Sequence, residues 1–208
     1  ILARGAVPIA LGGDDAIPIP FFRAYEGHGP LTLVQIDAHI DWRHEVDGVT
    51  EGYSSPMRRA SEMPWIGRIV QVGARGVGSA RPAELRDAQA YGATIITARD
   101  VHALGVEAVL QHVPEGGAFL VTIDGDGLDP AVMPGVNAPT PGGLTYQQVI
   151  DLVQGVARKG RIVGGDIVEV APARDLNGVS ALTAACIVTN LIGGMVRSGQ
   201  FDGRGPSN

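Results

Sequence analysis

Short apolar runs and amphipathic stretches alternate along the whole chain. Apolar runs of the length expected for buried strands occupy residues 7–11, 31–36, 68–72, 94–97, 118–123 and a two-part run, 161–165 with 167–170. Segments with helical spacing or helix-start signals lie between them, at residues 18–25, 55–62, 82–91, 101–112, 144–159 and 179–196. Strands that alternate with helices through short links indicate an α/β fold, here a three-layer α/β/α domain with a mainly parallel sheet.

Composition and charge narrow the class of protein. The length of 208 residues fits one domain, expected to span residues 1–208. The net charge of −6 argues against a nucleic-acid-binding surface, and the single cysteine, Cys186, excludes an internal disulfide and a cysteine-based metal site. No signal peptide and no apolar run of transmembrane length is recognised, so we expect a soluble, cytoplasmic protein without a membrane partner.

The start of the chain is unusual. It opens at Ile1 without a methionine and runs within a few residues into the first predicted strand. This looks like the tail of a helix that feeds a strand. We therefore expect the domain to lack its N-terminal part.

The strongest chemical signal follows the predicted strand at residues 31–36. Asp37, His39 and Asp41 stand at i, i+2 and i+4, a spacing that places side chains on one face of an extended chain. Where the strand ends and the backbone turns out of the sheet, the same spacing brings the three groups toward one point. Carboxylate oxygens with an imidazole nitrogen suit a divalent ion such as Mn, Ni, Fe or Zn. The alternative is a solvated polar loop.

Acidic residues follow other predicted strands in the same way: Asp14, Asp15, Asp124, Asp126, Asp129, Asp166 and Glu169. Sites in open α/β sheets form at the carboxyl ends of strands, where these acids would repel each other unless cations neutralised them. Two metal ions could bridge a water molecule and lower its pKa toward neutrality, which predicts hydrolysis of an unreactive electrophile. Asp129 precedes Pro130 and is instead expected to stabilise a turn.

Five segments, taken in order, resemble one known family. They are Gly-Gly-Asp-Asp at 12–15, Asp-Ala-His-Ile-Asp at 37–41, Asp-Gly-Asp-Gly-Leu-Asp-Pro at 124–130, the Pro- and Gly-rich stretch at 134–143, and Asp-Ile-Val-Glu-Val-Ala-Pro at 166–172. Their order and spacing are similar to those of the ureohydrolase family of arginases and agmatinases, with the agmatinase branch nearer. The resemblance covers nearly the whole chain. It implies two Mn(II) ions, or nickel in some members, and hydrolysis of a guanidino compound, above all agmatine, to urea and an amine by a metal-bridging hydroxide.

The resemblance also implies roles for individual residues. Its metal ligands would be Asp37, His39, Asp41, Asp124 and Asp126. Glu169 matches the acid that binds the substrate guanidinium, and a carboxylate suits that planar donor. Asp126 would be a catalytic residue that takes up a proton or would act only as a ligand.

Two positions depart from the family pattern. Asp15 stands where the family has a histidine ligand, so we expect Asp15 to bind metal through a shorter and more negative side chain. Tyr53 replaces a histidine near the substrate, and His44 in the same loop could substitute for it. We expect Trp42 and Arg43 to line the mouth of the site, where Arg43 could bind a substrate carboxylate.

Several alternatives stay open on the sequence alone. Arg43 as a carboxylate clamp favours a guanidino-acid hydrolase such as a guanidinobutyrase, whereas acidic residues of the same loop, Glu45, Asp47 and Glu51, could bind an ammonium group or form a solvated lid. The departures from the family pattern favour a non-catalytic homologue that keeps the fold as a subunit or binding module. A deacetylase of similar architecture would need one zinc ion and a His-His pair, which the sequence does not contain. The family also implies a small guanidino substrate and a homo-oligomer, either a trimer or a hexamer.

Overall fold

A computed structural model describes residues 1–202, which form one six-stranded sheet in the order β1-β6-β5-β2-β3-β4. Every strand is parallel to its neighbours. The strands are β1 (Ile9–Leu11), β2 (Leu31–Ile36), β3 (Ile66–Ala74), β4 (Thr94–Thr97), β5 (Ala118–Asp124) and β6 (Arg161–Val168). The predicted α/β fold with a parallel sheet is confirmed. The last part of the predicted domain, residues 203–208, lies outside the described residues.

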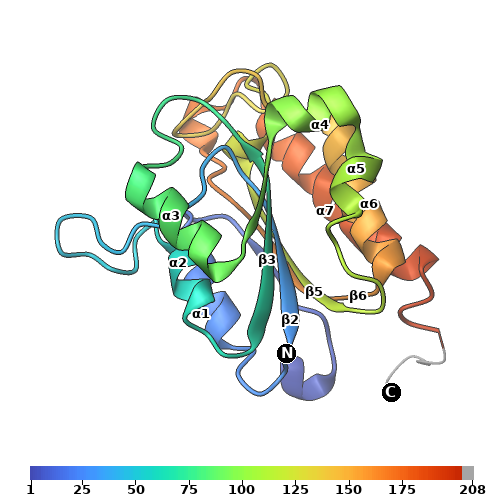
Figure 1. The fold of residues 1–208 in the computed structure, drawn as a ribbon. Helices are drawn as coiled ribbons and strands as arrows, with labels where there is room; N and C mark the ends of the chain where they lie inside the picture. The colour runs from blue at the N-terminus through green and yellow to red at the C-terminus, as the bar shows by residue number, and fades with distance from the viewer. Residues whose placement is uncertain (203–208) are drawn as a thin grey trace.

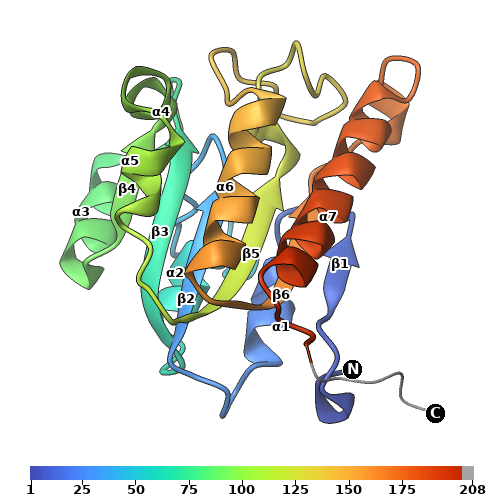
Figure 2. The ribbon, with the colours of Figure 1, turned by 90° about the vertical axis from the view of Figure 1, so that its right-hand side faces the viewer.

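Helices cover both faces of the sheet and give the molecule three layers (Figure 1). One face carries α1 (Pro18–Arg23), α2 (Pro56–Ser61) and α3 (Pro82–Tyr91). The other carries α4 (Ala98–Leu104), α5 (Val106–Leu110), α6 (Tyr146–Lys159) and α7 (Val179–Arg197). Figure 2 shows α6 and α7 side by side over β5 and β6. Short 3-10 turns cover Leu2–Arg4, Gly125–Gly127 and Pro172–Arg174.

Successive side chains of the central strands point to opposite faces of the sheet, and this divides the hydrophobic core into two parts. Leu31 and Leu33 of β2 pack in the cluster beneath α1, α2 and α3. Val34 and Ile36 pack in the cluster beneath α4 to α7. All six residues of β2 are buried, because a central strand with helices on both faces is shielded from water on both sides.

The structure differs from the sequence prediction between β4 and β5. The sequence predicts one helix over residues 101–112, which is wrong: α4 and α5 meet at Gly105. This glycine has φ 80° and ψ 169°, a conformation that residues with a side chain avoid, so no helix continues through it. α4 also begins before the predicted start, because Thr97 Oγ1 accepts a hydrogen bond from the Asp100 backbone and caps the helix.

Other element ends differ from the prediction by a few residues. The first strand begins at Ile9 rather than at residue 7, and the third is longer than predicted at both ends. Thr145 caps α6, so that helix begins at Tyr146 rather than at residue 144. The sixth strand is continuous through Asp166 and ends at Val168 rather than at residue 170.

α7 is a strongly apolar helix of 19 residues. Its mean hydropathy of 1.8 and its length would allow it to span a membrane, so the expectation that no apolar segment reaches that length is wrong. In the fold it packs against α6 and β6, burying Ile187, Leu191 and Met195. One-sided burial is the arrangement expected of a helix that covers a sheet.

The strand order places the carboxyl ends of β2 and β5 next to each other at the centre of the sheet. β2 leads through α2 to β3 on one side, and β5 leads through α6 to β6 on the other. Connections that leave in opposite directions open a crevice at this edge, which is where α/β proteins bind ligands. The predicted site segments 37–41 and 124–126 lie at the ends of these two strands.

Candidate metal centre

The loop after β2 brings three predicted site residues together. Asp37 and Asp41 are buried, and His39 is half-buried. The amide nitrogen of Gln35 donates to Asp37 Oδ2 at 2.7 Å and to Asp41 Oδ2 at 2.8 Å. His39 Nδ1 lies 3.4 Å from Asp37 Oδ1. The i, i+2, i+4 spacing therefore produces the convergence that the sequence predicts.

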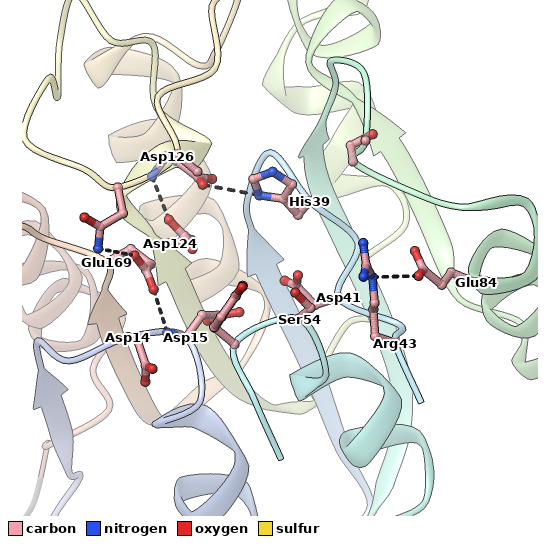
Figure 3. A pocket seen from close by; sticks show the side chains of 15 residues that line it. Asp14, Asp15, His39, Asp41, Arg43, Ser54, Glu84, Asp124, Asp126 and Glu169 are labelled. Carbon is pink, nitrogen blue, oxygen red and sulfur yellow. Dashed lines mark hydrogen bonds and ion pairs between the residues drawn. The ribbon is translucent and has the colours of Figure 1, made fainter. Parts of the chain in front are cut away.

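The end of β5 supplies Asp124 and Asp126. Asp124 Oδ1 accepts a hydrogen bond from the Asp126 backbone N–H at 2.7 Å and so caps the 3-10 turn that follows. Asp126 reaches the β2 loop, where its Oδ1 accepts from Ala38 N–H at 3.2 Å and its Oδ2 lies 3.2 Å from His39 Nδ1 (Figure 3). Direct contacts therefore join the loops after β2 and β5.

Asp15 enters the same cluster from the loop after β1. It is 3% exposed, and among the described residues its Oδ2 finds no hydrogen-bond partner. Its backbone N–H donates to Glu169 Oε1 at 3.0 Å, and Glu169 Oε2 accepts from the Asn137 amide at 3.3 Å. A buried carboxylate oxygen without a partner is costly unless a cation or a proton compensates it.

Backbone strain is present at two of these residues. Asp41 has φ 51° and Glu169 has φ 60°, both in the left-handed region. Aspartate occasionally adopts this conformation, but for glutamate it costs on the order of 1–2 kcal/mol. The surrounding fold therefore holds the Glu169 carboxylate in a direction that its own backbone preference would not select.

Donor atoms in the cluster form two overlapping groups. One group contains Asp37, His39 and Asp126, and the other contains Asp15, Asp37 and Asp124. Within each group the donor atoms lie within 4.8 Å of one another, and Asp37 belongs to both. The first group offers one imidazole nitrogen with carboxylate oxygens, and the second offers only oxygens. Both sets suit divalent cations, and the oxygen-only set suits the harder ones, such as Mn²⁺ or Mg²⁺.

The buried acids make one another harder to ionise. Burial raises the pKa of Asp15, Asp37 and Asp124 well above its ordinary value, and neighbouring carboxylates raise it further. Burial also raises the pKa of Asp41. An ionised cluster of this kind needs positive charge nearby. The donor chemistry and the unpartnered Asp15 oxygen therefore fit a pair of divalent cations.

A chain of buried polar side chains supports the β2 loop from beneath. Trp42 Nε1 donates to Gln71 Oε1 at 2.7 Å, and Gln71 Nε2 donates to Gln35 Oε1 at 2.5 Å and to the Ile40 carbonyl at 2.8 Å. Gln35 then donates to the two aspartates. Trp42 is only 2% exposed, so the prediction that it lines the mouth of the site is wrong. Its indole N–H needs a buried acceptor, and Gln71 provides one.

A pocket of about 470 Å³ opens over the cluster. Its lining residues are Asp14, Asp15, His39, Asp41, Arg43, Tyr53, Ser54, Gly78, Ser79, Glu84, Asp124, Asp126, Asn137, Ala138 and Glu169. Arg43 and Tyr53 thus reach the region where the sequence analysis expects them. Arg43 is paired, because its Nε lies 2.9 Å from Glu84 Oε1. In Figure 3 this pair and Glu169 lie on opposite sides of the carboxylate cluster.

The rest of the loop after β2 points away from the pocket. His44 is exposed, and its Nδ1 lies 3.2 Å from Arg59 Nη2, so the structure does not bring His44 to the place of the missing histidine. Glu51 forms an ion pair with Arg23 of α1. Glu45 and Asp47 are exposed and are not among the lining residues. The acidic part of the loop therefore lies outside the pocket.

Asp129 has the turn role that the sequence predicts. It accepts hydrogen bonds from the backbone N–H groups of Ala131, Gly142 and Gly143 at 2.9, 2.8 and 3.1 Å. Arg75 reinforces the same region by donating to the carbonyls of Asp126 and Thr140, each at 2.6 Å. These bonds hold the loop after β5 against the 138–143 segment.

Asp166 lies behind the cluster rather than on the pocket wall. Thr122 Oγ1 donates to Asp166 Oδ1 at 2.7 Å, and within the described chain Asp166 Oδ2 has no hydrogen-bond partner. Burial raises the pKa of Asp166 to about 7. It is therefore a buried acid within β6, not at the strand end that the sequence predicts, and the fold keeps it away from solvent.

Several residues that shape the site are not predicted from the sequence. Ser54, Ser79 and Glu84 line the pocket, and Gln35 and Gln71 lie beneath it. Glu84 is the third residue of a helix that begins with proline, which is a capping signal and gives no indication of a pocket. Gln35 carries a usable signal, since a polar residue inside an apolar strand needs buried partners.

Comparison with known proteins identifies the family. The family model described as "Arginase family" matches residues 1–193. The chain belongs to the arginase family. This confirms the ureohydrolase resemblance inferred from the five sequence segments.

Similar proteins share this fold and much of this sequence. Mitochondrial agmatinase of Gallus gallus is 35% identical over 199 residues, covering 92% of this chain and 58% of the relative. Guanidinopropionase of Pseudomonas aeruginosa is 37% identical over 196 residues, covering 91% and 61%. The crystal structure of agmatine ureohydrolase of Thermoplasma volcanium aligns with a TM-score of 0.84 at 29% identity, covering 97% of this chain and 66% of that one. This arginase-family chain thus spans about three-fifths of the length of these curated relatives.

Proposed function

We propose that this protein is a metal-dependent hydrolase that cleaves a guanidino compound to urea and an amine, with agmatine as the preferred substrate. The observation that carries the proposal is the pair of donor groups that share Asp37 at the floor of an open pocket. Family membership supports the same class of reaction, since similar proteins are named agmatinase and guanidinopropionase.

Two Mn(II) ions are the proposed cofactors. Their proposed ligands are Asp15, Asp37, His39, Asp41, Asp124 and Asp126. Mn²⁺ is favoured over Ni²⁺ because one donor group contains only carboxylate oxygens. When bound, such ions would act as Lewis acids and lower the pKa of a water molecule toward neutrality.

The chain's own side chains would orient the substrate. The carboxylate of Glu169 is held by the Asp15 N–H and the Asn137 amide, and it lines the pocket. A carboxylate can pair with a planar guanidinium through two parallel hydrogen bonds, so Glu169 is the proposed guanidinium-binding residue. Asp126 contacts His39 and is the proposed acceptor of a proton during hydrolysis, in addition to its role as a ligand.

The charge of the pocket favours a substrate with a cationic far end. Seven carboxylates line the pocket in the described chain, together with one guanidinium, that of Arg43, which is paired with Glu84. Two Mn²⁺ ions would neutralise most of the charge of the ligand aspartates and leave an excess of negative charge, to which Asp14 adds. Agmatine carries an ammonium group opposite its guanidinium, whereas a guanidino acid carries a carboxylate. A guanidino-acid hydrolase such as a guanidinobutyrase is the second candidate, supported by the position of Arg43 on the pocket wall.

Metal content and urea release test the proposal together. After dialysis against Mn²⁺, we expect elemental analysis to find two ions per chain, and we expect faster urea release from agmatine than from 4-guanidinobutyrate. Asp37→Asn weakens the ligand that both donor groups share. This variant should bind less metal and release urea roughly 100-fold more slowly. Asp151→Asn, on the exposed side of α6, is the matched control and should change neither.

A defined result would contradict the proposed hydrolase activity. One ion or none per chain, with no urea from either compound even after Asp15→His, would contradict the hydrolase. It would leave the non-catalytic homologue as the better account of Asp15 and Tyr53.

Our proposals for the assembly and partners of this protein rest on the family resemblance and on the net charge of the chain. We propose a homo-oligomer, either a trimer or a hexamer, which sedimentation velocity would distinguish from a monomer. A small guanidino compound is the proposed substrate, and the net charge of −6 gives no reason to propose a nucleic-acid partner.

A further inference from the structure

An ion pair is built into the pocket wall on the side away from Glu169 (Figure 3). Arg43 Nε lies 2.9 Å from Glu84 Oε1, and the two side chains are 23% and 11% exposed. Both residues line the same pocket as Glu169 and the metal-capable acids. A guanidino compound whose guanidinium lay at Glu169 would extend its far end across the cluster toward this pair.

Glu84 is held in place independently of Arg43. Its Oε2 accepts a hydrogen bond from the Arg81 backbone N–H at 2.8 Å, as the acidic member of the capping box that begins α3. Oε1 remains for Arg43. Helix α3 therefore fixes a negative charge at the point where the Arg43 guanidinium meets the pocket.

We propose that Glu84 determines the charge preference of the substrate's far end by neutralising Arg43. This inference rests on the proposed hydrolysis of a guanidino compound. An unpaired arginine on this wall would bind a carboxylate through its forked N–H groups. Paired with Glu84, it adds no net charge to the wall. Two bound Mn²⁺ ions would neutralise most of the ligand aspartates, so the negative charge that remains for an ammonium group comes from the excess ligand charge and from Asp14 on the pocket wall.

The rest of the wall offers no other cation for a carboxylate. Among the lining residues of the described chain, Arg43 is the only arginine, and no lysine is present. His39 is already engaged with Asp126 and Asp37. Removing the charge of Glu84 would therefore expose the one group able to reverse the preference.

The test is the variant Glu84→Gln. Glutamine retains an oxygen that can accept the Arg81 N–H, so the cap of α3 is kept while the negative charge is lost. The ratio of kcat/KM for 4-guanidinobutyrate to that for agmatine should rise by about tenfold or more, the size of one charge-assisted hydrogen bond. The double variant Glu84→Gln/Arg43→Gln should lose this gain. Glu107→Gln, a helical glutamate paired with Arg158 away from the pocket, is the matched control and should leave the ratio unchanged.

Calorimetric titration of the Mn²⁺-loaded protein with the same two compounds separates this inference from the hydrolase proposal. If no variant releases urea, the hydrolase proposal fails, and the relative affinities still report the effect of Glu84. An unchanged preference in Glu84→Gln, by turnover or by affinity, would overturn the inference. So would a gain that persists in the double variant, because Arg43 would then not be its source.

Discussion

At the scale of single residues, hydrogen-bond direction fixes how the β2 carboxylates are held. The indole of Trp42 can only donate, so Gln71 must present its oxygen to Trp42 and its nitrogen to Gln35. Gln35 must then present its own nitrogen to Asp37 and Asp41. If either glutamine amide were flipped, a donor would face a donor or an acceptor would face an acceptor. The buried chain therefore delivers two N–H donors to the carboxylates.

This direction predicts a role for Gln35 in metal binding. Gln35→Leu removes both donors from Asp37 and Asp41 and should weaken Mn²⁺ affinity by about 10–100-fold, as expected for the loss of a hydrogen-bond partner of metal ligands. Isothermal titration with Mn²⁺ measures the change. Gln147→Leu, on the exposed side of α6, is the control and should bind Mn²⁺ as the parent does. Equal affinities in both variants would show that Gln35 has only a packing role.

The acids of the cluster can be predicted from the sequence, whereas the residues that hold them in place cannot. Asp37, Asp41 and Asp124 follow apolar runs, and the carboxyl ends of parallel strands share one edge, so their meeting is predictable. Contacts such as Arg43 with Glu84 join residues far apart in sequence. Their meeting depends on how α3 packs, which no local pattern encodes.

At the scale of secondary structure elements, one glycine separates two helices. Gly105 adopts φ 80° and ψ 169° and ends α4 one residue before α5 begins. Space is not the constraint there, since a Cβ on Gly105 would meet nothing within 4 Å. The break is therefore a property of the backbone alone.

That conformation predicts a specific cost for a side chain. Gly105→Ala should lower the free energy of unfolding by about 1–3 kcal/mol, because only glycine adopts this region readily. Chemical denaturation followed by circular dichroism measures the loss. Gly92→Asn is the control: Gly92 ends α3 with φ 88° and ψ 25°, a left-handed conformation that asparagine tolerates. Equal costs for both variants would contradict the distinction.

Periodicity predicts where the strands and helices of this chain lie better than it predicts where a helix breaks. β2 and β4 match the prediction residue for residue: β2 is a fully buried strand that appears as a compact apolar run, and β4 is a partly buried edge strand. The helix predicted over residues 101–112 fails because its apolar spacing continues across Gly105 while the backbone does not. Spacing reports which face is buried, and it carries little information on ψ at one glycine.

At the scale of the whole molecule, buried acid makes stability depend on pH. Burial raises the pKa of Asp166 to about 7 from the ordinary 3.8, and it shifts Asp15, Asp37 and Asp124 in the same direction. Between pH 3.8 and about pH 7, Asp166 retains a proton in the folded chain that it releases in the unfolded chain. The folded form thus binds more protons, and its stability falls as pH rises through this window.

The metal-free protein should therefore be more stable at pH 5 than at pH 8. For Asp166 alone, the shift from 3.8 to about 7 corresponds to a total loss on the order of 4 kcal/mol, of which about 2–3 kcal/mol falls between pH 5 and pH 8. Thermal unfolding in EDTA at the two pH values measures it, and Asp166→Asn should reduce the difference. Mn²⁺ should flatten the dependence by compensating the ligand charges. If the metal-free protein became more stable as pH rose, the predicted direction of the pH dependence would be wrong.

The sharing of Asp37 between the two donor groups has a consequence for how the centre fills. The first cation would meet the full negative charge of the cluster, whereas the second would meet a cluster already partly neutralised and a carboxylate already engaged. Loading would then be sequential, with unequal stepwise affinities, and limiting metal would produce a half-loaded population. In a titration with metal, the bound metal would therefore increase before the activity does. Activity would rise only as the second, weaker site fills.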